Sequence, residues 1–117
     1  MIKTAITVSL VEQARGGPFV LWDGVEKGCQ TAARLGYDAI ELFAPGPDVV
    51  PVETVKELLK SNHIDIAAVG TGAGMVIHQL NLCDPDSGRR DQAKAFIQSM
   101  IQYGAQFGVP AIIGSMQ

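Results

Sequence analysis

One carboxylate stands out among the side chains of this chain that could do chemistry. Glu41 lies in a predicted strand from Tyr37 to Phe43, and it alternates with Ile40 and Leu42, which places it on the opposite face of that strand. A lone carboxylate on an inner face is costly unless another charge, a ligand or solvent compensates for it. We therefore expect Glu41 to contact a ligand.

Other polar side chains recur near the ends of the apolar segments. Besides Glu41, they are Thr7, Ser9, Thr71, Ser115 and Gln117. His78 lies in the long loop after the third segment, where we expect a histidine close to a ligand. His63 follows a predicted helix and is expected at the surface. The set predicts a ligand site if the fold brings these segment ends together.

The elements that must position these residues alternate between strands and helices. Hydrophobic spacing predicts strands at 5–10, 37–43, 64–70 and 110–116, and helices near 22–35, 51–62 and 86–107. Asp23 and Glu26 have the spacing of a capping box at the first helix. Gly36 and Gly108 are expected just past the ends of two helices.

A long loop is expected between the third strand and the last helix, from Thr71 to about Asp86. In it, Asp84 and Asp86 flank a proline and are predicted to form a turn and a helix N-cap. The glycines at 70, 72 and 74 do not continue as the GxGxxG of a dinucleotide site, because Met75 or Ile77 stands at the sixth position.

The alternating order of strands and helices predicts a parallel sheet. Such sheets are covered by helices on both faces or closed into a barrel with the helices outside. Four strands are predicted with no helix after the last, and the 117 residues are about half of the ~250 in a complete barrel. We predict a single α/β domain, residues 1–117, that forms the first four β/α strands of a (β/α)8 TIM barrel and is truncated after strand 4.

In such a half-barrel, the polar strand ends would form part of an active-site floor. Active sites of these barrels lie at the C-terminal ends of the strands and in the loops that follow. Alternation places Thr7 and Ser9 on the face of the first strand that points to the barrel interior. On the last strand, the inward residues are expected to be Ala111, Ile113, Ser115 and Gln117.

Composition and charge exclude several classes of protein. The net charge is -3 and no basic run occurs, which argues against a nucleic-acid surface. No apolar stretch is long enough for a membrane span, and no signal peptide is apparent, so we expect a cytoplasmic protein. Cys29 and Cys83 are interpreted as reduced thiols, buried or half-buried. No residues show metal-ligand spacing, so no metal site is expected in this chain itself.

Three stretches resemble the xylose isomerase-like TIM-barrel superfamily of sugar phosphate isomerases and epimerases. The first is Ala33-Arg34-Leu35-Gly36-Tyr37-Asp38-Ala39-Ile40-Glu41-Leu42, which leads into the second predicted strand. The second is 81–86, followed by Arg90, Ala93 and a long amphipathic helix, and the third is 107–114. The resemblance covers the N-terminal half of such a barrel.

The resemblance implies an enzyme that moves a proton next to the carbonyl of a sugar or sugar phosphate, with a divalent metal such as Mn, Mg, Co or Zn in the complete barrel. Metal ligands and acid/base carboxylates would come mainly from strands 5 to 8, so this half alone would be inactive and would supply substrate contacts. By position, these contacts would be Glu41, His78, Ser115 and Gln117, with Phe19 or Trp22 from the first loop as apolar walls.

Other functions remain open at this point. Apurinic endonucleases of the same superfamily carry histidines at the ends of strands 3 and 4, where this sequence has none, and its acidic charge also disfavours DNA. Keto-inositol dehydratases and hydroxypyruvate isomerases are not distinguished. A different class is a non-catalytic half-barrel that assembles with a second copy or a partner chain. The unpaired edges of strands 1 and 4 favour association, so we expect a homo-oligomer.

Overall fold

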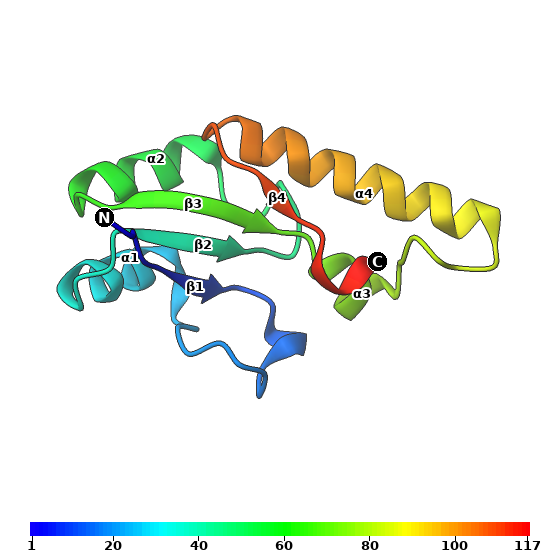
Figure 1. Cartoon of the computed structure of the whole chain (residues 1–117), viewed down its shortest axis with the longest axis horizontal. Helices are drawn as coiled ribbons and strands as arrows, with labels where there is room; N and C mark the ends of the chain where they lie inside the picture. Colours follow the sequence, from blue (N-terminus) through cyan, green and yellow to red (C-terminus); the bar gives the residue numbers. More distant parts are fainter.

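The computed structural model describes all residues from 1 to 117. A single sheet holds four parallel strands in the order β1-β2-β3-β4 (Figure 1). The strands are β1 (Ala5–Ser9), β2 (Ala39–Phe43), β3 (Asp65–Gly70) and β4 (Ala111–Ile112), and the helices are α1 (Gly24–Arg34), α2 (Val52–Ser61), α3 (Ala73–His78) and α4 (Ser87–Ala105). Short 3₁₀ turns lie at Glu12–Ala14 and Gly114–Met116. The predicted α/β class and four-stranded parallel half-barrel are confirmed, and the sheet is not closed.

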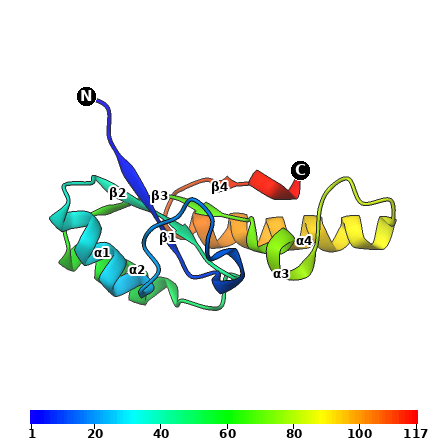
Figure 2. The ribbon, with the colours of Figure 1, turned by 90° about the horizontal axis from the view of Figure 1, so that it is seen from below.

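The three longer helices cover only one face of the sheet. Figure 2 shows α1, α2 and α4 on one side, with β4 and the C-terminal segment toward the other. The main core fills the space between helices and sheet, where Val8 and Leu42 from the strands meet Val55 and Met100 from the helices, all fully buried. Each such side chain stabilises the fold by about 1.5–3 kcal/mol. The opposite face is left to form a site.

The strand register places two rows of residues on that opposite face. One row runs from Thr7 through Glu41 to Ala68, and the next from Ser9 through Phe43 and Gly70 to Ile112. A register shift after Ile40 leaves Ala67 without a partner on β2. Glu41 therefore pairs with Ala68 and not with Ala67. The rows put the polar and aromatic residues of three strands beside one another.

The prediction for the last strand was wrong in length and in face. β4 contains only Ala111 and Ile112, and the chain then turns into the 3₁₀ turn Gly114–Met116. Ala111 packs against the helix-side core, whereas Ile112 pairs with Gly70 on the opposite face. The register is set by hydrogen bonds to β3, including Val69 N–H to the Pro110 carbonyl at 3.1 Å, rather than by the side-chain pattern.

The loop after β3 also differs from the prediction, because it contains the six-residue helix α3. This helix ends where Gln79 adopts a left-handed backbone conformation with φ of 55°. The expected Asp84–Asp86 turn is confirmed: the Asp84 carboxylate accepts from the Asp86 N–H at 2.9 Å. The Asp86 carboxylate in turn caps α4 by accepting from the Arg89 N–H at 3.0 Å.

The first helix begins as predicted but without the predicted cap. Asp23 precedes α1, yet its side chain makes no capping hydrogen bond and instead lies 3.5 Å from the Lys27 ammonium. Gly36 and Gly108 follow their helices with φ of 85° and 71°, a left-handed conformation that confirms the two predicted helix ends.

The outer edge of β1 is partly paired, which corrects the expectation of a free edge. The chain returns beside it, so that Leu21 bridges to Val8 and the Leu21 carbonyl accepts from the Ser9 N–H at 2.9 Å. Only the N-terminal part of this edge lacks such a neighbour.

The two cysteines differ in their surroundings. Both are free thiols, as interpreted from the sequence. Cys29 is buried in the main core, where burial raises the pKa of its thiol to about 11 and so disfavours the reactive thiolate. Cys83 is exposed, which contradicts the prediction that it is buried or half-buried. None of the helices combines the length and the apolar character that crossing a membrane requires.

Candidate functional site

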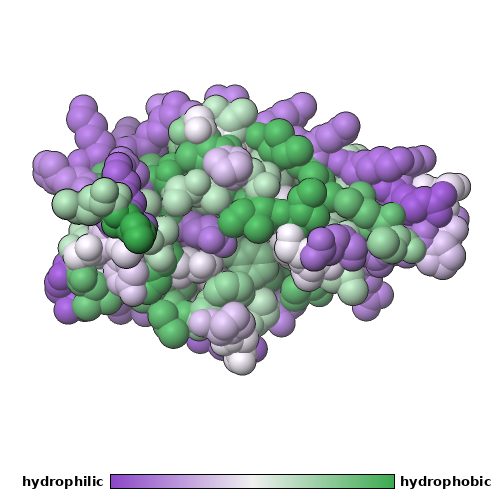
Figure 3. Space-filling model, in the orientation of Figure 1, coloured by the Kyte–Doolittle hydropathy of each residue, from purple (hydrophilic) through white to green (hydrophobic).

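A cavity of about 310 Å³ lies at the C-terminal ends of β2 and β3, on the sheet face without long helices. Its lining comes from the first loop, the strands, α3 and the last turn: Ala14, Phe19, Glu41, Phe43, Gly70, Thr71, Gly72, Val76, Ile112, Gly114 and Ser115. Figure 3 shows hydrophobic residues gathered over β4 and the segment that follows it on this face. We refer to this cavity as the inner-face cavity.

Glu41 is the one ionisable side chain in the lining of the inner-face cavity. It is half-buried in the middle of β2, with Thr7 and Ala68 as its neighbours in the sheet. Burial alone raises the pKa of its carboxyl group, since neither a hydrogen bond nor a nearby charge contributes. The carboxylate therefore has no protein partner and is free to accept hydrogen bonds from a ligand.

Two phenylalanines form the aromatic part of the wall. Phe43, from the inner row of β2, packs against Phe19 from the first loop with ring centroids 5.2 Å apart. The Phe43 ring also lies close to the backbone of Gly70 and Gly72, where an added Cβ would come within 3.2 Å of ring atoms. The two glycines therefore leave room for this ring in the cavity wall.

Thr71 holds the last strand and turn in place beneath the cavity. Its hydroxyl lies 2.9 Å from the Ile112 carbonyl oxygen and 2.8 Å from that of Ile113, and donates to them. The side chain is fully buried. Thr71 therefore positions Ser115, which follows Ile113 by two residues and lines the cavity. The Ser115 hydroxyl oxygen lies 3.3 Å from the position of a Cβ at Gly72.

Trp22 supports the wall without lining the cavity. Its indole N–H donates to the Phe19 carbonyl at 2.9 Å, which fixes the backbone from which the Phe19 ring projects. The Arg15 guanidinium lies 5.0 Å from the centre of the Trp22 ring, and it also forms an ion pair of 2.7 Å with Glu12. Arg15 is thus held by Glu12 and Trp22 on the outside of the first loop.

His78 and Gln117 lie outside the inner-face cavity. His78 is the last residue of α3, is exposed, and packs the edge of its ring against Phe96 with centroids 6.1 Å apart. Gln117 is exposed after the last turn. Of the six expected contact residues, the structure gathers Glu41, Phe19 and Ser115 around the cavity, places Trp22 behind the wall and leaves these two outside.

Four apolar lining residues were not among the six expected contacts: Ala14, Phe43, Val76 and Ile112. Phe43 lies on the same strand face as Glu41, so the alternation of β2 could have identified it. Ile112 was assigned to the wrong face of its strand, and Val76 lies on α3, which was not predicted. No pattern in the sequence signals Val76, because a helix of six residues shows less than two turns of hydrophobic spacing.

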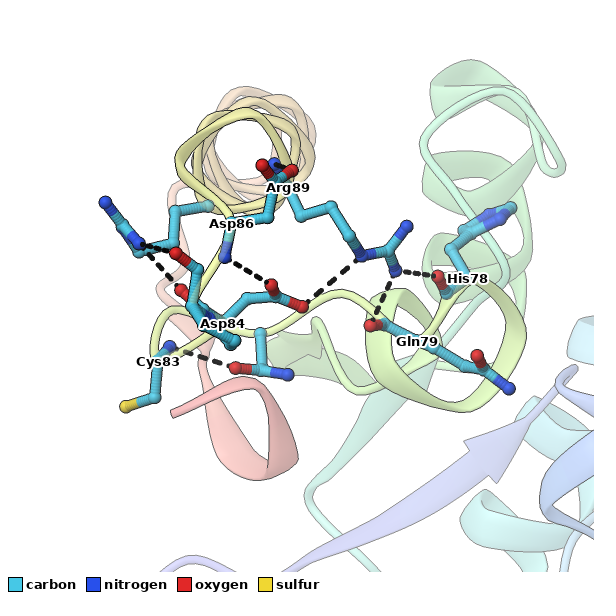
Figure 4. A network of polar contacts seen from close by, with 9 residues as sticks. His78, Gln79, Cys83, Asp84, Asp86 and Arg89 are labelled. Carbon is cyan, nitrogen blue, oxygen red and sulfur yellow. Dashed lines mark hydrogen bonds and ion pairs between the residues drawn. The ribbon is translucent and has the colours of Figure 1, made fainter.

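Arg89 fixes the C-terminal end of α3, as Figure 4 shows. Its guanidinium donates to the carbonyl oxygens of His78 at 3.0 Å and Gln79 at 2.8 Å, and it pairs with the Asp84 carboxylate at 3.3 Å. Arg90 donates to the Asp84 carbonyl at 2.7 Å. These contacts hold α3 against the start of α4 and thereby set the cavity wall that α3 provides.

A larger cavity of about 480 Å³ lies at the other end of the sheet, between α2 and the end of α4. Lys56, Lys60, Asp65, Gln106 and four apolar residues line it. It borders the start of β3, the end of a barrel that serves stability rather than chemistry. We therefore place the candidate site in the inner-face cavity.

The side chains of this chain do not fit a metal centre. No group of three histidine, cysteine, aspartate or glutamate side chains lies close enough together to hold an ion. Glu41 is the only potential ligand of this kind in the lining of the inner-face cavity. The chemistry that this arrangement can perform by itself is ligand binding through one carboxylate, one free hydroxyl and an aromatic wall.

Comparison with known families agrees with this architecture. Residues 29–116 match the family described as the xylose isomerase-like TIM barrel. The matched region extends from α1 through the last turn and includes Glu41 and Ser115. No curated protein matches the chain. The chain belongs to the xylose isomerase-like TIM barrel family.

Proposed function

We propose that this chain forms a substrate-binding half of the active site of a sugar or sugar-phosphate isomerase or epimerase. The observation that carries the proposal is the unpartnered carboxylate of Glu41 in a cavity at the C-terminal ends of parallel strands. This is the end of a barrel at which active sites lie. Membership of the xylose isomerase-like family supports the same reading.

The proposed reaction moves a proton at the carbon next to a sugar carbonyl. Such a step requires an acid/base group on the reacting carbon and stabilisation of the negative charge that develops on the carbonyl oxygen. The residues of this chain do not form a metal-binding group for that stabilisation. The ligands of a divalent metal, and the acid/base groups, would therefore have to come from other strands of a complete barrel. The role of Glu41, Phe19 and Ser115 is to bind and orient the sugar.

The experiment that tests this function is exchange of carbon-bound hydrogen with solvent. A barrel that contains residues 1–117 together with the strands that complete it is incubated in deuterated water with a panel of ketoses, their phosphates and divalent metals. Deuterium incorporated next to the carbonyl, followed by NMR, is the expected result. No exchange with any substrate and metal would rule the isomerase proposal out.

A second candidate function is that of a non-catalytic half-barrel that assembles with a second copy or a partner chain. The apolar surface at the end of β4 favours it, because Ile112 and Ile113 are 43% and 40% exposed and Ile112 lies on the face without long helices. The edge of β4 is also the last in the sheet. Light scattering should then show a dimer or larger assembly, and a stable folded monomer would remove this candidate.

A further inference from the structure

We propose that the inner-face cavity binds an uncharged, hydroxyl-bearing part of a sugar, and that it disfavours a phosphate group. This inference rests on the proposed function and names the part of the substrate that this half of the site receives. The cavity volume of about 310 Å³ is at the small end of the ~300–1,000 Å³ range of ligand sites. Its size suits a monosaccharide rather than a larger ligand.

The charge of the cavity lining disfavours an anion. Glu41 is the one ionisable side chain that lines it, and no lysine, arginine or histidine does so. Arg15 is the nearest cation along the chain to the lining residue Ala14, but Glu12 and Trp22 hold its guanidinium outside. A phosphate in the cavity would therefore face the Glu41 carboxylate without a compensating charge, and like charges at close range repel.

The apolar part of the lining suits the carbon face of a sugar. The rings of Phe19 and Phe43 pack together at 5.2 Å, and Val76 and Ile112 extend the apolar wall. The C–H groups on one face of a sugar ring can lie against such rings and bury apolar surface. Sugar hydroxyls on the other edge can donate to the carboxylate of Glu41. The combination selects a neutral polyol.

The chain carries its own reporter for this test. Trp22 is the single tryptophan, its ring centroid lies 6.3 Å from that of Phe19, and its indole N–H holds the Phe19 backbone. The probes are D-fructose and D-fructose 1-phosphate, which can both form the pyranose ring and differ only in the phosphate. Each is titrated into the 117-residue chain while Trp22 fluorescence is recorded, and the thermal unfolding midpoint is measured in parallel.

The expected result is saturable binding of fructose, with fructose 1-phosphate bound about threefold more weakly or worse, since a half-exposed carboxylate is screened in part by solvent. Glu41→Gln keeps the size of the side chain and removes its charge. In this variant, the preference for fructose should fall to less than about twofold. Glu57→Gln on the exposed side of α2 makes the same change of charge outside the cavity and should keep the preference of the native chain.

Three outcomes would overturn the inference. They are tighter binding of the phosphate than of fructose, a preference that is the same in Glu41→Gln, and no effect of either sugar on fluorescence or unfolding. The result is separable from that of the exchange assay. A barrel that exchanges no hydrogen can still contain a cavity with this charge preference, and an active isomerase can lack it.

Discussion

The hydroxyl of Thr71, at the end of β3, lies 2.9 Å from the Ile112 carbonyl oxygen and 2.8 Å from that of Ile113, and shares its single hydrogen between them. The Thr71 N–H also donates to the Ile112 carbonyl, at 3.0 Å. A strand of only two residues is thus attached to the sheet by one buried side chain as well as by its backbone. The position of Ser115 at the inner-face cavity depends on this attachment.

Replacing Thr71 by Val should loosen the last strand. The substitution keeps the shape of the side chain but removes the hydroxyl donor of the Ile113 carbonyl, which also accepts from the Met116 N–H at 3.4 Å. Loss of this one hydrogen bond costs about 0.5–1.5 kcal/mol of the free energy of unfolding. Urea denaturation measures this loss. Thr71→Ser keeps the hydroxyl and should lower the free energy of unfolding by less than Thr71→Val does. Equal stability of Thr71→Val and the native chain would show that the hydroxyl does not hold β4.

The pKa of Glu41 predicts how the stability depends on pH. Burial raises the pKa of Glu41 in the folded chain. At a pH between the ordinary pKa and the raised pKa, the folded state therefore keeps a proton on Glu41 that the unfolded state has released. Stability from this group is therefore present in acid and falls as the pH rises from the ordinary pKa of glutamate, about 4.3, through the raised value.

Glu41→Gln tests that dependence, because it removes the titrating group. At neutral pH, the variant should be more stable than the native chain, and the difference should shrink as the pH falls through the raised pKa and be lost below about 4. Glu57→Gln is the matched exposed control and should show no such trend. Denaturant unfolding at several pH values measures both. A variant that is less stable at neutral pH would indicate that the carboxylate has a stabilising partner.

Gly28→Ala should destabilise the contact between α1 and β1. A Cβ at position 28 would lie 2.6 Å from a methyl carbon of Val8, which is fully buried in the main core. Alanine in a helix normally gains up to ~1 kcal/mol over glycine, but overpacking costs about 1–3 kcal/mol and should outweigh that gain. The double variant with Val8→Ala should show a favourable coupling energy. If the effects of the two substitutions on the free energy of unfolding simply add, this contact is not the cause of the loss.

Arg89→Met should free the C-terminal end of α3. The change removes the hydrogen bonds to the carbonyl oxygens of His78 and Gln79 and the pair with Asp84. We expect a loss of about 1–2 kcal/mol and faster hydrogen exchange of the α3 amides. Lys94→Met removes an exposed ion pair with Asp91 and should change stability by less than ~1 kcal/mol. Unchanged exchange in Arg89→Met would exclude this positioning role.

The sequence predicted those parts of the structure that repeat a regular pattern. The alternation around Glu41, with Ile40 and Leu42 on the helix side, was sufficient to place it on the open face. The fourth strand could not be derived in the same way. In the run Ala111–Ile113 the apolar residues do not alternate, and the face of each is decided by pairing with β3 and by the Thr71 hydroxyl.

The site was predicted only where it depends on strands. The position of His78 depends on α3, on the left-handed conformation of Gln79 and on the guanidinium of Arg89, which are tertiary features without a local signal. Trp22 likewise does not line the cavity, and its indole N–H binds the Phe19 carbonyl. Loop residues close in sequence to a cavity therefore need not line it.

The measurement that tests the central claim most directly is the kinetics of hydrogen exchange in the completed barrel with Glu41 and with Glu41→Gln. If this chain binds the sugar, the variant should raise the KM for a neutral ketose about fivefold, as expected for replacing a charged hydrogen-bond acceptor by a neutral one, while kcat changes by less than about twofold. An unchanged KM, or a loss confined to kcat, would contradict a binding role for Glu41.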